Sequence, residues 1–320
     1  MQVWKVAALG TPAHQAEHPL PTPEPGQARL KIAAVGLNFA DLLMAEGKYQ
    51  EHPALPFIPG MEFAGILDAL HPDTSTTLKP GTRVAGFASH GALAEYLTAA
   101  AAQLIPLPDS MSFQQAAAFQ IAYGTSHLAL SHKARLQPGE TLLVFGAAGG
   151  VGLTAVEIGK RMGAKVIACA RGPEKLAIAR AAGADITLDS ETPDLKAALK
   201  ALGGVDVVYD PVGGPAFTAA LSACRPEGRL LTIGFASGQL PEIPANHLLV
   251  KNLSVMGLYW GGYLTFAPQV LTDSLRILFQ WFAEGGLRPH ISHELPFEDY
   301  PKGLDLLRTR AATGKVVITL

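Results

Sequence analysis

The chain has 320 residues, more than one hydrophobic core usually organises, so two domains are expected. Hydrophobic residues make up 48% of the chain and charged residues 16%, which is typical of a well-buried globular protein. The formal net charge of −2 argues against a nucleic acid as the main partner.

Three further features bear on the compartment. No run of residues approaches the roughly 18 consecutive apolar positions of a membrane span, and the first residues lack the pattern of a signal peptide. The only cysteines, Cys169 and Cys224, make a disulfide framework improbable. A cytoplasmic protein without a membrane partner is therefore expected.

The first part of the chain consists of short β segments separated by Pro/Gly turns. Alternating or compact apolar patterns predict strands at Ala28–Val35, Glu62–Leu67, Arg83–Phe87 and Ala94–Leu97. From about residue 112 the texture changes, and the Ala-rich segment Met111–Leu130 is predicted to be helical. Pro138-Gly139 then marks a turn.

A strand, a glycine-rich turn and a helix follow directly. The apolar run Thr141–Phe145 leads into Gly146-Ala-Ala-Gly-Gly-Val-Gly152, and helical periodicity continues over Leu153–Met162. This arrangement leaves backbone N–H groups free at a helix N-terminus, where the helix dipole favours a pyrophosphate. Gly149 would let the backbone approach the phosphates, and Gly152 would allow the helix to pack closely on the strand. The context predicts a dinucleotide site.

Strand and helix patterns alternate from there on. The predicted strands are Lys165–Cys169, Ile186–Leu188, Asp206–Asp210, Arg229–Ile233 and Leu253–Met256, and the predicted helices are Pro173–Ala182, Pro193–Leu202 and Ala216–Ala223. Such alternation indicates a parallel sheet covered by helices on both faces.

The last sixty residues resemble the first part of the chain more than this βαβ block. They carry helices near Pro268–Glu284 and Glu298–Arg310 and a closing strand at Lys315–Thr319. We therefore expect an α/β protein in which a dinucleotide-binding domain at residues 116–258 is inserted into a discontinuous catalytic domain at residues 1–115 and 259–320.

The strand after the glycines bears on the choice of dinucleotide. NAD-specific folds place an acidic residue at its end, and Cys169-Ala170 occupies that region here. Arg171 and Lys175 lie just beyond, although Glu174 stands between them. A missing carboxylate together with nearby cations favours the 2′-phosphate of NADPH. The alternative is that both cations are ordinary solvated surface residues.

Motifs in a fixed order extend this pattern over nearly the whole chain: Gly36–Asp41, Gly47–Tyr49, Leu55–Gly65, Lys79–Val84, Leu136–Glu140, Ala147–Gly152, Asp206–Gly214 and Gly314–Val317. Together they resemble the medium-chain dehydrogenase/reductase superfamily, and within it the zinc-independent quinone oxidoreductase branch. The resemblance implies a GroES-like, mainly β catalytic domain and a doubly wound Rossmann domain that binds NADPH.

The zinc alcohol dehydrogenases of the same superfamily provide a contrast. The resemblance places Asn38 and Met61 where that branch has its first zinc ligand and its histidine, and no cysteine precedes Cys169. Asparagine and methionine are poor substitutes for the Cys and His ligands that Zn²⁺ requires. A metal-free protein is expected.

The resemblance implies hydride transfer from NADPH to a small molecule, a quinone or an α,β-unsaturated carbonyl such as an enone or alkenal. Without zinc, an electrophilic acceptor is a better substrate than an alcohol. Two alternatives stay open: an enoyl-thioester reductase of the acryloyl-CoA type, and a catalytically idle family member that only binds NADPH.

Residue roles carried over from the family fall mainly on the cofactor. The residues expected to contact NADPH are Asn38, Thr125, Gly149, Gly150, Val151, Arg171, Lys175, Ser190, Gly234, Phe235, Leu258 and Lys315. Some have a structural alternative: Asn38 as a turn cap, Thr125 as a helix residue bonded to its own turn, and Lys315 as an exposed strand-edge charge. Ser190 departs from the family, which commonly has tyrosine there.

Asn38, Tyr49 and Asp41 are the candidates for catalysis. Tyr49 could donate a proton through its phenol or be an ordinary packed tyrosine, and Asp41 is expected to orient neighbours or cap the following helix rather than transfer a proton. Tyr259 and Trp260 could line an aromatic slot for the acceptor, or they could be interface or core aromatics. By resemblance, Leu253–Met256 could pair with a second copy in a homodimer or homotetramer.

Overall fold

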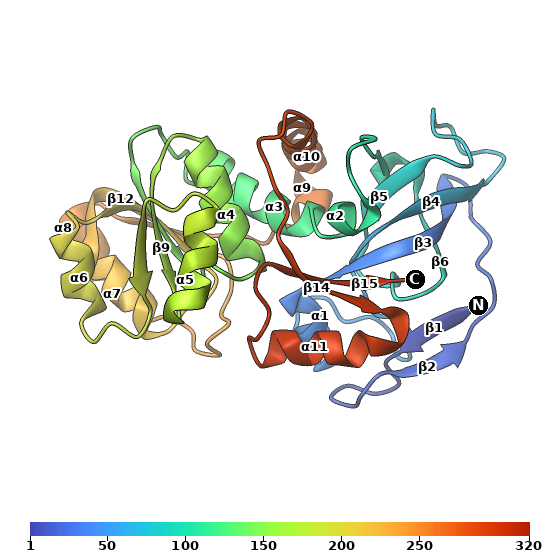
Figure 1. Ribbon diagram of the computed structural model, residues 1–320, viewed down its shortest axis with the longest axis horizontal. Helices are drawn as coiled ribbons and strands as arrows, with labels where there is room; N and C mark the ends of the chain where they lie inside the picture. Colours follow the sequence, from blue (N-terminus) through green and yellow to red (C-terminus); the bar gives the residue numbers. More distant parts are fainter. The chain divides into compact units, whose positions relative to one another are not determined.

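The computed structural model describes all 320 residues and contains two compact units (Figure 1). The first unit comprises residues 1–121 and 289–320, and the second comprises residues 122–288. The changes between units thus fall at 121 and 288, whereas the sequence patterns place them at 115 and 258. None of the helices combines the length and the apolar composition that crossing a membrane requires.

Residues 259–288 lie with the second unit because one amphipathic helix packs there. Helix α10 (Pro268–Ala283) buries Leu275 and Leu278. Its Ser274 hydroxyl lies 2.7 Å from Nδ1 of the buried His127. The stretch resembles the first domain in sequence texture, but these contacts assign it to the second unit.

The first unit is organised around a seven-stranded, mainly antiparallel sheet. Its strand order is β14-β15-β3-β4-β5-β7, and β6 also pairs with β3. The strands are β3 (Gln27–Leu37), β4 (Glu62–Leu70), β5 (Arg83–Phe87), β6 (Tyr96–Ala100), β7 (Ile105–Pro106), β14 (Ile291–Pro296) and β15 (Lys315–Thr319). A separate hairpin joins β1 (Gln2–Lys5) and β2 (His14–Glu17). The period-two pattern of Ala28, Leu30 and Ile32 places all three in the core.

Short helices accompany this sheet: α1 (Phe39–Ala45), α2 (Phe113–Ala117) and α11 (Tyr300–Arg308), with 3₁₀ turns η1 (Ala101–Gln103) and η3 (Phe297–Asp299). Helix α2 lies against β3 at a glycine. A Cβ atom on Gly36 would stand only 1.9 Å from the carbonyl oxygen of Ala117. A glycine is therefore required at this point of close backbone approach.

The second unit contains a six-stranded parallel sheet in the order β10-β9-β8-β11-β12-β13. Its strands are β8 (Thr141–Phe145), β9 (Lys165–Ala170), β10 (Ile186–Asp189), β11 (Val205–Asp210), β12 (Cys224–Thr232) and β13 (Ser254–Gly257). This is the doubly wound Rossmann order, with a reversal between β8 and β11. The predicted α/β class and parallel sheet are confirmed.

Helices lie on both sides of that sheet, as Figure 1 shows for α4 and α5 against α6 and α7. The helices of the unit are α3 (Gln120–His127, which begins in the first unit), α4 (Gly150–Arg161), α5 (Gly172–Ala181), α6 (Leu195–Ala201), α7 (Pro215–Ala223), α8 (Ala245–Lys251), α9 (Tyr263–Phe266) and α10. All three helices predicted between the strands are present.

The segment Met111–Leu130, predicted to be helical, forms successive helices rather than one. Helix α2 ends at Ala117, α3 begins at Gln120, and a π-helical turn, η2, covers Leu128–Lys133. Ala118 leaves the helical conformation while Phe119 is driven into the core. Burial of a large side chain thus overrides the uniform helical preference of an Ala-rich sequence.

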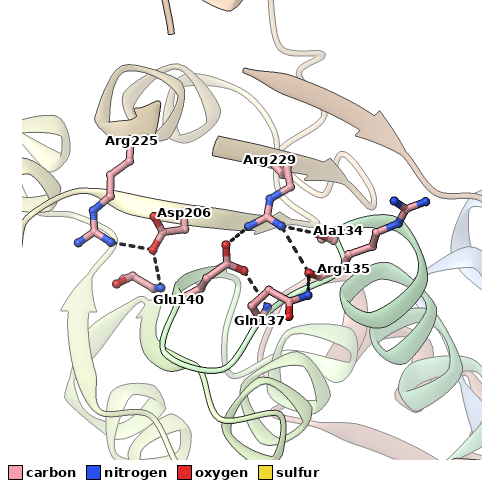
Figure 2. Close-up of polar contacts among 8 residues, drawn as sticks. Ala134, Arg135, Gln137, Glu140, Asp206, Arg225 and Arg229 are labelled. Atoms are coloured by element: carbon pink, nitrogen blue, oxygen red, sulfur yellow. Dashed lines mark hydrogen bonds and ion pairs between the residues drawn. The ribbon is translucent and has the colours of Figure 1, made fainter. Parts of the chain in front are cut away.

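Ion pairs close the amino-terminal edge of the parallel sheet (Figure 2). Asp206 accepts hydrogen bonds from the Thr141 backbone N–H at 2.8 Å and from Arg225 at 2.7 Å. Glu140, just before β8, pairs with Arg229 on β12. These side chains pair with one another at the amino-terminal edge of the sheet. Ligands of such sheets bind at the opposite edge, where the carboxyl ends of the strands lie.

Candidate cofactor site and buried polar cluster

A tight glycine turn connects β8 to α4. Gly146 adopts a φ of +56°, and its carbonyl oxygen accepts a hydrogen bond from the Gly149 N–H at 2.8 Å. Gly149 is the N-cap of α4, which starts at Gly150. The first N–H groups of a helix have no acceptor within the helix, so Gly150 and Val151 present donors at this end.

Two glycines of the turn differ in the space around them. A Cβ on Gly152 would lie 2.1 Å from the Gly146 oxygen, so this position must be glycine for the helix to pack on the turn. A Cβ on Gly149 would meet only that same oxygen, at 3.3 Å. Gly149 therefore borders open space, as the approach of a phosphate requires.

The loop after β11 lies beside this turn. Asp210 ends β11, and its carboxylate accepts the N–H groups of Val212 and Gly213 at 2.7 and 2.9 Å. A Cβ on Gly146 would contact Pro211 and Val212. The glycine turn thus stands at the reversal of strand order, where ligands of such sheets bind.

The remaining predicted residues of this unit reach the same edge. Gly234 donates its N–H to Asp210 O at 3.4 Å, and Leu258 donates to Thr232 O at 3.1 Å. Phe235, next to Gly234, is an exposed aromatic residue. The loops after β12 and β13 therefore bring all three predicted positions to the carboxyl edge of the sheet.

Charges of both signs surround the end of β9. Arg171 pairs with Glu191 at 3.1 Å, and both side chains are exposed. Ser190 is exposed and donates its backbone N–H to Ala170 O at 3.0 Å. Lys175 lies in the first turns of α5. The three predicted 2′-phosphate residues thus gather around one strand end, but a carboxylate competes for Arg171.

Helix α3 is tied to the glycine turn by hydroxyl groups. The Ser126 hydroxyl lies 2.8 Å from that of Thr154 on α4 and 3.0 Å from that of Tyr209 on β11, and it donates to Val151 O at 2.9 Å. Thr125 is buried in the same helix. This network, which the sequence patterns did not reveal, anchors the residue next to Thr125.

A buried polar cluster in the first unit includes Asn38, one of the residues expected from the family resemblance to contact NADPH. Lys315 Nζ donates to Asn38 Oδ1 at 2.6 Å and to Glu62 Oε2 at 3.0 Å. Asn38 Nδ2 donates to Glu62 Oε2 and to Gly36 O, each at 3.3 Å. Glu62 Oε1 accepts the Ile121 N–H at 2.8 Å. Lys315 is only 4% exposed, so it is not a strand-edge surface charge.

Asp41 adjoins this cluster from the first turn of α1. It is 2% exposed, and its Oδ2 accepts the backbone N–H of Asn38 at 2.8 Å. This hydrogen bond is part of the capping box at the start of α1. Burial raises the pKa of Asp41 to about 6, against the lowering effects of the Asn38 N–H and of Lys315. The carboxyl group therefore changes charge near neutral pH.

Tyr49 packs against a second, apolar cluster of the first unit. That cluster contains Met44, Phe57 and Met61. Burial, with Glu51 and Asp41 nearby, raises the pKa of the Tyr49 phenol to about 12, so it stays in its proton-donating form at neutral pH.

Met61 is thus a core residue, and no group of three or more His, Cys, Asp or Glu side chains is arranged to hold a metal ion. His127 is likewise structural, with Ser274 on one side and an edge-to-face contact to Trp281. Trp260 is buried against α3, where a Cβ on Gly124 would lie 2.6 Å from its Nε1. Tyr259 remains partly exposed, at 36%.

Glu62 was not singled out from the sequence. One sequence feature could have pointed to it: Glu62 begins the apolar strand Glu62-Phe-Ala-Gly-Ile. A carboxylate at such a position is buried in the sheet and needs hydrogen-bond or ion-pair partners. Lys315, far away along the chain, could not be identified as that partner from local pattern alone.

Two family models match the chain. Residues 24–109 match the alcohol dehydrogenase GroES-like domain, and residues 150–277 match the zinc-binding dehydrogenase model. The first match covers strands β3 to β7 of the first unit, and the second covers strands β9 to β13 of the second unit.

Curated relatives and solved structures agree with these models. The quinone oxidoreductase-like protein 2 homolog of Nematostella vectensis is 41% identical over 91% of this chain and 81% of its own length. The quinone oxidoreductase of Thermus thermophilus, solved also with NADPH, is 35% identical with a TM-score of 0.89 over both full chains. The Escherichia coli quinone oxidoreductase complexed with NADPH is 28% identical with a TM-score of 0.91, again over both full chains.

Proposed function

Because the chain belongs to the quinone oxidoreductase-like branch of the medium-chain dehydrogenase/reductase superfamily, we propose that it is an NADPH-dependent, zinc-independent reductase of quinones or α,β-unsaturated carbonyls. NADPH, when bound, supplies the hydride, and the protein supplies position and polarity.

The observation that carries the proposal is the turn from β8 to α4. It combines free helix N–H groups, open space at Gly149 and a place at the reversal of strand order. Two of the solved relatives described above were crystallised with NADPH. The residues present fit a dinucleotide: Gly149, Gly150 and Val151 would hold the pyrophosphate.

The choice of NADPH over NADH rests on the end of β9. Buried Cys169 stands where an NAD-specific fold has its acid, and its pKa is raised to about 12, first by burial. Arg171, Lys175 and Ser190 would hold the 2′-phosphate, with Arg171 exchanging Glu191 for the phosphate.

The first unit would supply the groups that act on the reacting end. Asn38 would contact the nicotinamide side, and Tyr49 is a phenol kept protonated by burial, which suits it to donate a proton to a developing oxyanion. Asp41 is proposed to hold the start of α1 in place through Asn38 N rather than to transfer a proton.

Steady-state NADPH oxidation against quinones, alkenals and enoyl thioesters tests the proposal. Turnover of quinones or alkenals is expected. Preference for enoyl thioesters would replace the substrate class, and NADPH binding without turnover of any acceptor would identify a catalytically idle binding protein. Failure to bind either reduced nicotinamide cofactor would overturn the proposal entirely.

We also propose that two copies associate through the second unit. Strand β13 is the last strand of the parallel sheet, and the neighbouring helix α8 exposes Leu249 and Val250, each 79% accessible. Light scattering coupled to size exclusion is expected to give a dimer or a tetramer. Substitution of both side chains by lysine should shift that mass towards the monomer.

A further inference from the structure

We propose that Glu62 is a positioning residue which, with Lys315, holds the amide of Asn38 in a single orientation for the reaction; this rests on the proposed function. Glu62 is 0% exposed, and it lies in β4 between β3 and β5. Its two oxygens receive three donors from distant parts of the chain: Ile121 N, Lys315 Nζ and Asn38 Nδ2.

The chemistry of the two neighbours leaves the amide no choice of orientation. An ammonium group can only donate, so the atom facing Lys315 must be the amide oxygen. An ionised carboxylate can only accept, so the atom facing Glu62 must be the amide nitrogen. The 2.6 Å contact to Lys315 and the 3.3 Å contact to Glu62 therefore determine both ends of the Asn38 side chain.

The orientation decides what Asn38 can offer a ligand. Both hydrogens of its Nδ2 are directed to protein acceptors, Glu62 Oε2 and Gly36 O. Its Oδ1 uses one lone pair on Lys315 and retains the second. Asn38 thus presents an acceptor, which suits an N–H donor such as a carboxamide and does not suit an oxyanion.

Retention of buried charge agrees with a positioning role. A buried ion pair is costly to desolvate and is often replaceable by apolar residues of similar volume without loss of stability. Glu62 and Lys315 also make directed contacts to Asn38 that apolar residues would lack. The pair is therefore better explained by the amide it orients than by stability.

The test is a cycle of variants that keeps the charges balanced. Glu62→Gln alone would deprive the buried Lys315 of its ion-pair partner, so Glu62→Gln/Lys315→Met, which removes both charges, is combined with Asn38→Ala. The wild type, Asn38→Ala, the double variant and the triple variant are compared by kcat, by KM for the acceptor and by the dissociation constant of NADPH from fluorescence titration.

Asn38→Ala and the double variant are each expected to lower kcat by about 10- to 100-fold, because misplacement of a positioned group has effects of that size. The triple variant should then be within about twofold of Asn38→Ala, since the pair acts through the amide. Losses that multiply in the triple variant would overturn the proposal, and so would an unchanged kcat in the double variant.

Asp206 and Arg225 provide a matched control. Asp206 also accepts one backbone N–H and one cation, but at the amino-terminal edge of the parallel sheet (Figure 2). Asp206→Asn/Arg225→Met should lower the melting temperature without changing kcat. A wild type that reduces no acceptor would refute the proposed function and not the positioning role of Glu62. In that case the NADPH dissociation constants of the same four proteins are compared in place of kcat.

Discussion

The proposed functional groups are backbone N–H groups in the second unit and side chains in the first. In the second unit the donors are backbone N–H groups, placed by the glycine turn between β8 and α4, and the ion pair of Arg171 and Glu191 beyond β9 is exposed. In the first unit the groups are the side chains of Asn38 and Tyr49, and three buried charged residues hold Asn38 in place: Asp41, Glu62 and Lys315. A backbone site depends on chain geometry at a few glycines, whereas a buried charged site depends on every partner.

Gly152→Ala should have the largest effect on the backbone site at the glycine turn. The new Cβ would stand 2.1 Å from Gly146 O and force the turn open, so the free energy of unfolding should fall by about 3 kcal/mol and NADPH binding should weaken by at least about tenfold. Thermal unfolding and fluorescence titration measure the two effects.

Gly149→Ala is the matched control, because its Cβ meets only one atom, at 3.3 Å. It should keep the melting temperature and still weaken NADPH binding by crowding the phosphates. Equal stability losses at both positions would contradict the packing role of Gly152.

The buried carboxyl of the first unit should make stability decrease as pH rises. The pKa of Asp41 is about 6 in the folded chain and 3.8 ordinarily, so the folded state binds the extra proton between these values. The stabilisation is complete below pH 3.8 and is lost as pH rises through 6, by on the order of 3 kcal/mol.

Denaturant unfolding of Asp41→Asn and the wild type across about pH 4.5 to 8 isolates this effect. The variant should gain stability relative to the wild type as pH rises, because asparagine does not titrate and lacks the loss caused by ionising Asp41. Its amide oxygen can still accept the Asn38 N–H, so the cap of α1 is kept. A difference between the two that is constant with pH would exclude titration of Asp41 in this range.

The buried histidine of the second unit should act with the opposite sign. Burial lowers the pKa of His127 from 6.5 to about 4, so the unfolded chain binds the extra proton. Stability is therefore complete above pH 6.5 and is lost as pH falls towards 4, by on the order of 3 kcal/mol at the limit. His127→Gln should flatten this acid limb; an unchanged acid limb would show that His127 is not responsible.

The two cations after β9, exposed Arg171 and half-buried Lys175, should have the smallest effects. Arg171→Ala/Lys175→Ala is expected to weaken NADPH binding by about tenfold more than NADH binding, as the loss of two contacts to one phosphate would. Glu191→Gln should tighten NADPH binding slightly, because it removes the partner that competes for Arg171 at 3.1 Å. Equal changes for both cofactors would refute the 2′-phosphate assignment.

Most elements of the second unit could be predicted because their patterns are local. Each strand from β8 to β13 and each helix from α4 to α7 has its own apolar run and its own turn residues. The first unit was harder. The separate hairpin β1–β2 and the edge strand β14 were not expected, because few of their residues are buried and no regular apolar alternation marks them.

The candidate site divides in the same way. The glycine turn and Arg171 are predictions from the sequence itself, because the residues of this candidate site lie close to one another along the chain. Asn38 and Lys315 are predictions from the resemblance, which does not indicate the contact between them and does not point to Glu62. Glu191 was missed because an exposed carboxylate shows no distinguishing pattern before its partner is known.

The α/β class, the parallel sheet and the turn that would hold a dinucleotide can be predicted from the order of the residues, because period, glycine spacing and chain order are local properties. The contacts of Glu62 and Lys315 with Asn38, and the packing of residues 259–288 with the second unit, arise from the folded arrangement. Burial and partner choice belong to the folded chain, because a carboxylate in a strand has no assigned partner until the sheet brings one within hydrogen-bond distance.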